Sequence, residues 1–106
     1  MIFHDLKNIP EKEIMPGFFG RFIHTEEMTF AYWNIKAGSV LPEHAHLQVQ
    51  VANMLEGEFE LTVNGHTRRL TEGMPVVIPS NAVHSGMAIT DCKILDVFNP
   101  ARDDYR

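Results

Sequence analysis

Short runs of β-branched and aromatic residues, separated by turn residues, follow one another along most of the 106-residue chain. The clearest run spans residues 58–63, where Phe59, Leu61 and Val63 alternate with polar residues and give a strand one apolar face. The dipeptide Asn64-Gly65 follows, and it favours the positive φ angles of a two-residue hairpin turn. Residues 66–70 then form the returning strand. This part of the chain is therefore predicted to be a β-hairpin.

The same pattern predicts further strands at residues 18–24, 28–35, 44–55, 76–78, 82–87 and 92–98. Residues 25–27 are predicted to form a hairpin turn, and residues 36–38 to break the pattern. Residues 1–17 are expected to be an irregular lead-in with one helical turn around residues 11–14, and residues 18–106 a single barrel domain. Eight or nine short strands without a long helix indicate an all-β sandwich or closed barrel, since closure removes exposed sheet edges.

Charge and cysteine content exclude several classes of function. The net charge of −5 argues against a nucleic-acid partner. No stretch approaches the roughly 18 apolar residues of a membrane span, and the N-terminus lacks the pattern of a secretory signal, so we expect a cytoplasmic protein. Cys92 is the only cysteine, which excludes an internal disulfide and an all-thiolate zinc site. It lies in an apolar run and is expected to pack in the core.

Three polar residues with even spacing suggest a metal site. His44, His46 and Gln50 lie two and four residues apart within the predicted strand 44–55, so their side chains point to the same face. His84, from a later strand, would complete a set of four neutral ligands. Imidazole suits zinc, copper, iron or nickel. On these residues alone, a His-x-His pair is more often an exposed or hydrogen-bonded strand.

The opposite face of the strand 44–55 is apolar. It carries Leu47, Val49, Val51 and Leu55, with Asn53 as its one polar member. If the polar row of this strand faces the barrel interior, the apolar row must be covered by other protein. We therefore expect either a second sheet or a partner subunit over this face, and a homodimer is the favoured assembly.

Two motifs in the chain resemble those of the cupin family. The first reads Gly38, five residues, His44-x-His46, three residues, Gln50, six residues, Gly57, and the second reads Gly73, five residues, Pro79-x-Asn81, two residues, His84. The resemblance covers residues 36–98. It implies a cupin double-stranded β-helix, or jelly-roll barrel, with a divalent metal ion held by His44, His46, Gln50 and His84.

Two residues depart from the cupin pattern. Asn81 stands where the family has glycine, and asparagine tolerates a left-handed backbone nearly as well as glycine does. Gln50 stands where the family has a glutamate ligand. The site therefore has one negative charge less, which leaves the metal more Lewis acidic and more weakly held. Nickel, zinc, iron and manganese all remain open as the native ion.

The C-terminal residues resemble a particular group of cupins, the KdgF family. These small bacterial proteins convert 4,5-unsaturated monouronates from pectin and alginate breakdown into linear ketonised sugars. Asp96 and Phe98 share a face of the last predicted strand, and Arg102 follows a proline-containing turn that could fold it back over the barrel mouth. The resemblance implies that Asp96 is the acid/base, that Phe98 and Arg102 contact substrate, and that the ligand is a carboxylated sugar.

Other interpretations of these residues stay open at this point. Asp96 could accept hydrogen bonds from turn amides, Phe98 could simply pack in the barrel, and Arg102 could belong to a charged surface tail. Trp33 is expected to be a packing residue. The alternative functions are another cupin isomerase or lyase, an iron-dependent oxidative enzyme, and a binding module for a small molecule or metal without turnover.

Overall fold

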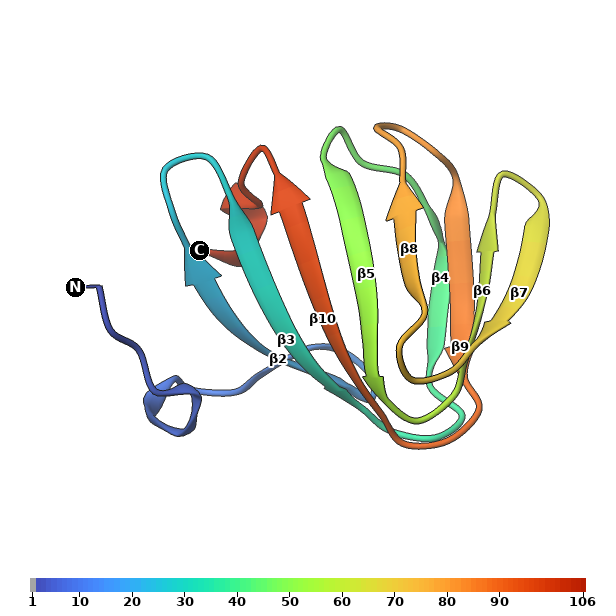
Figure 1. The fold of residues 1–106 in the computed structure, drawn as a ribbon, viewed down its shortest axis with the longest axis horizontal. Helices are drawn as coiled ribbons and strands as arrows, with labels where there is room; N and C mark the ends of the chain where they lie inside the picture. Colours follow the sequence, from blue (N-terminus) through green and yellow to red (C-terminus); the bar gives the residue numbers. More distant parts are fainter. Residues whose placement is uncertain (1) are drawn as a thin grey trace.

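The chain folds into two antiparallel β-sheets that face one another (Figure 1). The computed structural model describes residues 2–106 and contains ten strands in that range. One sheet has the strand order β1-β2-β3-β10-β5-β8 and the other has the order β4-β9-β6-β7. The strands are β1 (Lys12–Met15), β2 (Phe18–His24), β3 (Thr29–Ile35), β4 (Val40–His44), β5 (Val49–Glu56), β6 (Phe59–Val63), β7 (His66–Leu70), β8 (Pro75–Ile78), β9 (His84–Ala88) and β10 (Cys92–Asn99).

Alternating burial along the strands builds the core between the two sheets. In β3 and β10, which are neighbours in the six-stranded sheet, every second residue is buried, so Trp33, Ile35, Ile94 and Phe98 share the inner face of that sheet. The other sheet contributes Phe59, among others, to the same cluster. The predicted all-β jelly-roll barrel is confirmed.

The predicted turns have the expected backbone geometry. Asn64 and Gly65 have φ angles of 48° and 80°, which places β6 and β7 in a hairpin with Val63 opposite His66. Asn81 has a φ of 62°, so it does adopt the left-handed conformation that a glycine would have taken. The turn at residues 25–28 closes with a hydrogen bond from the Thr25 N–H to the Met28 carbonyl.

The predicted helical turn at residues 11–14 is wrong. Lys12–Met15 forms β1, which pairs with β2, and the nearest helical turn is the 3-10 segment Leu6–Asn8. The Asp5 side chain caps that segment by accepting a hydrogen bond from the Lys7 N–H. Residues 12–15 pair instead with the open edge of a sheet, which satisfies their backbone groups better than an isolated turn would.

The predicted strand 44–55 is also wrong as a single element. It is divided between β4 and β5, which belong to different sheets and are joined by residues 45–48. β4 was missed because Pro42 lies inside it, and proline is usually excluded from strands. β4 is an edge strand of the four-stranded sheet, where a missing N–H is tolerated.

The outer face of β5 and β8 is apolar and exposed. Leu47 and Val77 are 64% and 66% exposed, and Val49 and Leu55 are exposed as well. Within residues 2–106 no second sheet covers this face, so that part of the expectation is wrong, and the homodimer stays a prediction. None of the helices in the described part of the chain is long and apolar enough to cross a membrane.

Candidate metal centre

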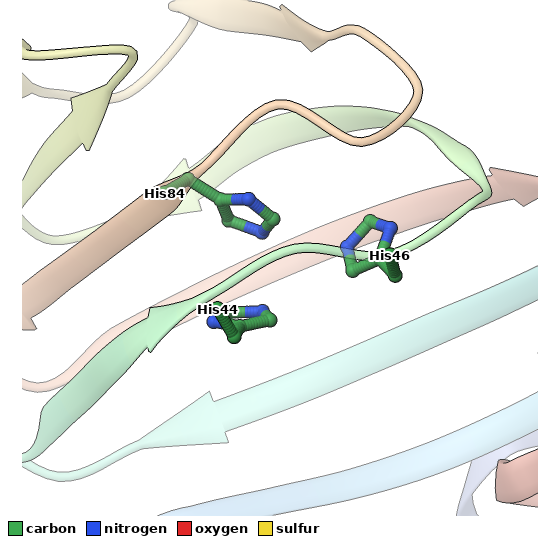
Figure 2. A group of neighbouring side chains, drawn as sticks. All are labelled: His44, His46 and His84. Carbon is green, nitrogen blue, oxygen red and sulfur yellow. The ribbon is translucent and has the colours of Figure 1, made fainter.

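Three histidines converge at the end of the barrel where β4 and β10 end and β5 and β9 begin. His44 is the last residue of β4, His84 is the first residue of β9, and the two lie directly opposite each other in the sheet. His46 lies on the connection to β5. One ring nitrogen of each histidine lies within 4.8 Å of the others, and Figure 2 shows the three imidazoles gathered around one point. The grouping was predicted from the alternation of side chains along a single strand. His44 and His46 do not share a strand, so this alternation is not the cause of the grouping.

Backbone carbonyls fix the tautomer of each imidazole. The Nδ1 atoms of His44, His46 and His84 lie 2.8, 3.0 and 2.9 Å from the carbonyl oxygens of Pro42, Gln48 and Ala82, respectively. A carbonyl oxygen only accepts hydrogen bonds, so each Nδ1 carries the proton. Each Nε2 therefore has a free lone pair. Backbone partners of this kind orient metal-binding imidazoles in proteins.

Two of the three histidines, His46 and His84, have a lowered pKa that favours the neutral imidazole at physiological pH. Burial lowers the pKa of His84 to about 4, with smaller contributions from the neighbouring imidazoles and Arg102. Burial also lowers the pKa of His46, again assisted by the Arg102 charge. Neutral imidazoles with converging lone pairs repel one another, and a cation between them removes that repulsion. The donor set thus fits a divalent metal ion.

Gln50 adds an oxygen to this set. It is the second residue of β5, is 7% exposed, and lies opposite Phe98 of β10. Its Oε1 lies 3.1 Å from Nε2 of His46. Because Nδ1 of His46 holds the proton, both atoms present lone pairs, and a cation bound to both would remove the repulsion between them. Three imidazole nitrogens and one amide oxygen suit borderline metals such as zinc, nickel or iron.

Asp96 lies in the same pocket as the histidines and is buried. The Trp33 Nε1–H donates to its Oδ2 at 3.0 Å, whereas its Oδ1 has no hydrogen-bond partner among the described residues. Burial raises the pKa of Asp96 to about 6, although Gln50, Trp33 and Arg102 partly oppose this rise. A carboxyl group with this pKa exchanges protons readily near neutral pH.

Arg102 and Phe98 also line the pocket, and the Phe98 ring lies beside His46, with 5.6 Å between the ring centres. Phe98 is fully buried, and the Arg102 guanidinium lies over its ring at 4.8 Å from the ring centre. The backbone N–H of Arg102 donates to Thr29 Oγ1 at 2.8 Å. This hydrogen bond holds the C-terminal tail, residues 100–106, at the start of β3. The tail thus folds back over the barrel mouth, as its sequence suggested, and Arg102 is not a surface residue.

Two pocket residues have roles that the sequence analysis did not assign. Trp33 was expected to be a packing residue, and it does pack, but it also holds Asp96. The alternation of residues along β3 indicated that the Trp33 side chain points inward. It did not indicate that β10 places the Asp96 carboxylate next to the indole N–H. Tyr105 lies in the 3-10 segment Asp103–Tyr105 and lines the pocket beside Phe98 and Trp33.

Residues 31–98 match the family described as the cupin domain. This match spans well over half of the chain. The chain belongs to the cupin family. Its barrel and its three converging histidines are therefore those of a cupin with a potential metal centre.

Solved cupin structures are similar over nearly the whole chain. The structure of KdgF from Halomonas sp. is 27% identical with a TM-score of 0.92, and the match covers 98% of this chain and 97% of that one. An RmlC-like cupin from Shewanella frigidimarina is 26% identical with a TM-score of 0.95, covering 100% and 96%. An uncharacterized protein from Streptomyces coelicolor is 25% identical over 91 residues, which is 85% of this cupin and 87% of the relative.

Proposed function

We propose that this cupin is a metal-dependent enzyme that converts 4,5-unsaturated monouronates, derived from pectin or alginate, into linear ketonised sugars. The observation that carries the proposal is one pocket in which metal-binding groups, a buried acid and a guanidinium lie together. The likeness to KdgF from Halomonas sp., which extends over 98% of the chain, supports it. A non-catalytic binding module would not need a buried carboxyl group with a pKa near 6.

The metal ligands in this proposal are His44, His46, Gln50 and His84. A divalent ion bound there would supply Lewis acidity toward the oxygen atoms of the substrate. The ligands themselves are all uncharged, so the ion keeps its full positive charge. A substrate with a negative carboxylate and several hydroxyl groups is well matched to such a centre.

Asp96 is the proton carrier in this proposal. Opening of the unsaturated ring removes the proton of the C1 hydroxyl group and breaks the bond between C1 and the ring oxygen. The oxygen at C5 leaves as an enolate because Asp96 holds the proton taken from the C1 hydroxyl group, and this enolate becomes a ketone when Asp96 returns the proton to C4. The reaction is an isomerisation, so one carboxylate that first takes a proton and then returns one balances it. Oδ1 of Asp96 is free for this exchange because Trp33 holds Oδ2.

Arg102 and Phe98 orient the substrate. Arg102 recognises the carboxylate, since a guanidinium offers parallel N–H groups that match the two oxygen atoms of a carboxylate. Phe98 supports the guanidinium from one side and limits its movement. An anchored carboxylate fixes the position of C4 and C5 relative to Asp96, which is how positioning increases the rate.

A direct assay tests this proposal. Unsaturated galacturonate absorbs ultraviolet light through its conjugated double bond, and ketonisation removes that absorbance. The metal-loaded protein should accelerate the loss well above the spontaneous rate, and Asp96→Asn should return the rate to near background while metal content stays unchanged. Full metal occupancy without acceleration would contradict the proposal. Binding without turnover would instead identify a sensing module, and oxygen consumption with iron would identify an oxidative enzyme.

A further inference from the structure

The guanidinium that is proposed to bind the substrate already has a carboxylate partner. The Arg102 Nε–H donates to Oδ1 of Asp104 at 3.0 Å, and the Nη2–H donates to Oδ2 at 2.8 Å. This pair occupies one edge of the guanidinium, namely the edge formed by Nε and Nη2. A guanidinium has five N–H groups, so three remain, and they include both groups on Nη1. The edge formed by Nη1 and Nη2 is therefore still available to a second carboxylate.

The two partners of this ion pair differ in their surroundings. The Arg102 side chain is 11% exposed and lines the pocket, whereas the Asp104 side chain is 59% exposed and does not line it. The Arg102 guanidinium also lies 4.2 Å from the ring centre of Tyr105, in addition to its contact with Phe98. Two aromatic rings and one bidentate ion pair thus hold this cation at the pocket wall.

The local backbone keeps Asp104 in place. Asp104 lies in the 3-10 segment Asp103–Tyr105, which Arg102 precedes directly, and the Tyr105 N–H donates to the Arg102 carbonyl at 3.0 Å. Arg102 itself is tied to Thr29. The neighbouring Asp103 points elsewhere, because it forms an exposed ion pair with Arg106. Two adjacent aspartates on one turn therefore have separate partners.

We propose that Asp104 is a positioning residue for carboxylate recognition. It holds Arg102 by the Nε edge, so that the edge formed by Nη1 and Nη2 binds the carboxylate of a uronate in the plane of the guanidinium. This inference rests on the proposed function and adds a residue to it. The pKa of Asp104 is lowered chiefly by its hydrogen bond to Arg102, so this carboxylate stays ionised at the pH of the assay.

Asp104→Asn tests this role, with Asp103→Asn as the matched control on the same turn. Both variants and the wild type are compared as metal-loaded proteins. The dissociation constant for D-galacturonate is measured by calorimetry, and kcat and KM are measured with unsaturated galacturonate. We expect Asp104→Asn to weaken D-galacturonate binding and raise KM by about tenfold, with a smaller change in kcat, because a loosened anchor binds less well. Asp104→Glu should restore most of the affinity, and Asp103→Asn should match the wild type.

The possible outcomes separate the two proposals. Tighter binding by Asp104→Asn would show that Asp104 competes with the substrate, and unchanged binding would show that it has no role, so either result overturns the inference alone. A wild-type protein that neither binds D-galacturonate nor consumes the unsaturated uronate overturns the proposed function, and the role of Asp104 with it. Thermal unfolding and metal content of each variant show whether the fold and the metal centre are intact. If Asp104→Asn unfolds, Asp104→Ala takes its place, since this side chain is largely exposed; the same rise in KM is expected, and an unchanged KM in the folded variant overturns the inference.

Discussion

Replacing Asp96 with asparagine separates the cost of the buried carboxyl group from its proposed role in catalysis. Asparagine has nearly the same shape, and its side-chain oxygen can still accept the hydrogen bond from the Trp33 indole. What the substitution removes is ionisation. The folded protein buries Asp96, so its charged form is unfavourable there. The variant should therefore lose activity and gain a pH-dependent increment of stability over the wild type.

The magnitude follows from the pKa of Asp96. Burial raises it from 3.8 to about 6 in the folded state, and one pKa unit corresponds to about 1.4 kcal/mol. The ionised group therefore costs the folded protein about 3 kcal/mol at pH 7. The sign follows from proton binding, since between pH 4 and pH 6 the folded state holds more protons than the unfolded state. This contribution to stability is fully present below about pH 4 and is lost as the pH rises through about 6.

The assay is urea unfolding of the metal-free wild type and Asp96→Asn at pH 4 and pH 7.5. The difference between the two free energies of unfolding should shift by about 2.5 kcal/mol in favour of the variant at the higher pH, because pH 4 lies just above the unfolded pKa of 3.8. His84 also titrates in this range, but it is present in both proteins and cancels in the comparison. Burying the amide group of the variant has a free-energy cost that does not depend on pH, so this cost also cancels when the two pH values are compared. A difference that is the same at both pH values would refute the reasoning.

Three further predictions concern other parts of the molecule. His84→Ala should lower the affinity for a divalent ion by at least about tenfold, whereas His66→Ala on the exposed strand β7 should leave it unchanged; elemental analysis after dialysis against a weak chelator measures both. We propose that two copies associate through the apolar outer face of β5 and β8, so Val77→Lys should convert a dimer to a monomer in sedimentation equilibrium, and a monomeric wild type would contradict this. Because burial raises the pKa of the Cys92 thiol, alkylation by iodoacetamide should be slow in the native protein and fast in urea, and equal rates would show that the thiol is accessible.

The strand pattern alone predicted most of the barrel. Local signals were strong where apolar alternation and turn residues agreed, as in the hairpin of β6 and β7 around Asn64 and Gly65. They failed at β4, where Pro42 concealed an edge strand, and at β1, which is a strand only because β2 offers an open edge. Both failures depend on neighbours that are distant in sequence, and no local propensity reports them.

The three histidines do lie together, but not for the reason from which their grouping was predicted. His44 and His46 were grouped by spacing on one supposed strand, whereas the chain actually changes sheets between His44 and Gln50. The Trp33 contact with Asp96 joins residues 63 positions apart, so only the pairing of β3 with β10 could reveal it.

The central claim is that His44, His46, Gln50 and His84 bind one metal ion. X-ray absorption spectroscopy at the metal edge, combined with anomalous diffraction from crystals of the metal-loaded protein, tests it directly. We predict one ion per chain with three imidazole nitrogens at about 2.0–2.1 Å and at least one oxygen ligand, if the ion is zinc. An ion bound elsewhere on the chain, or none at this position at full loading, would contradict the account.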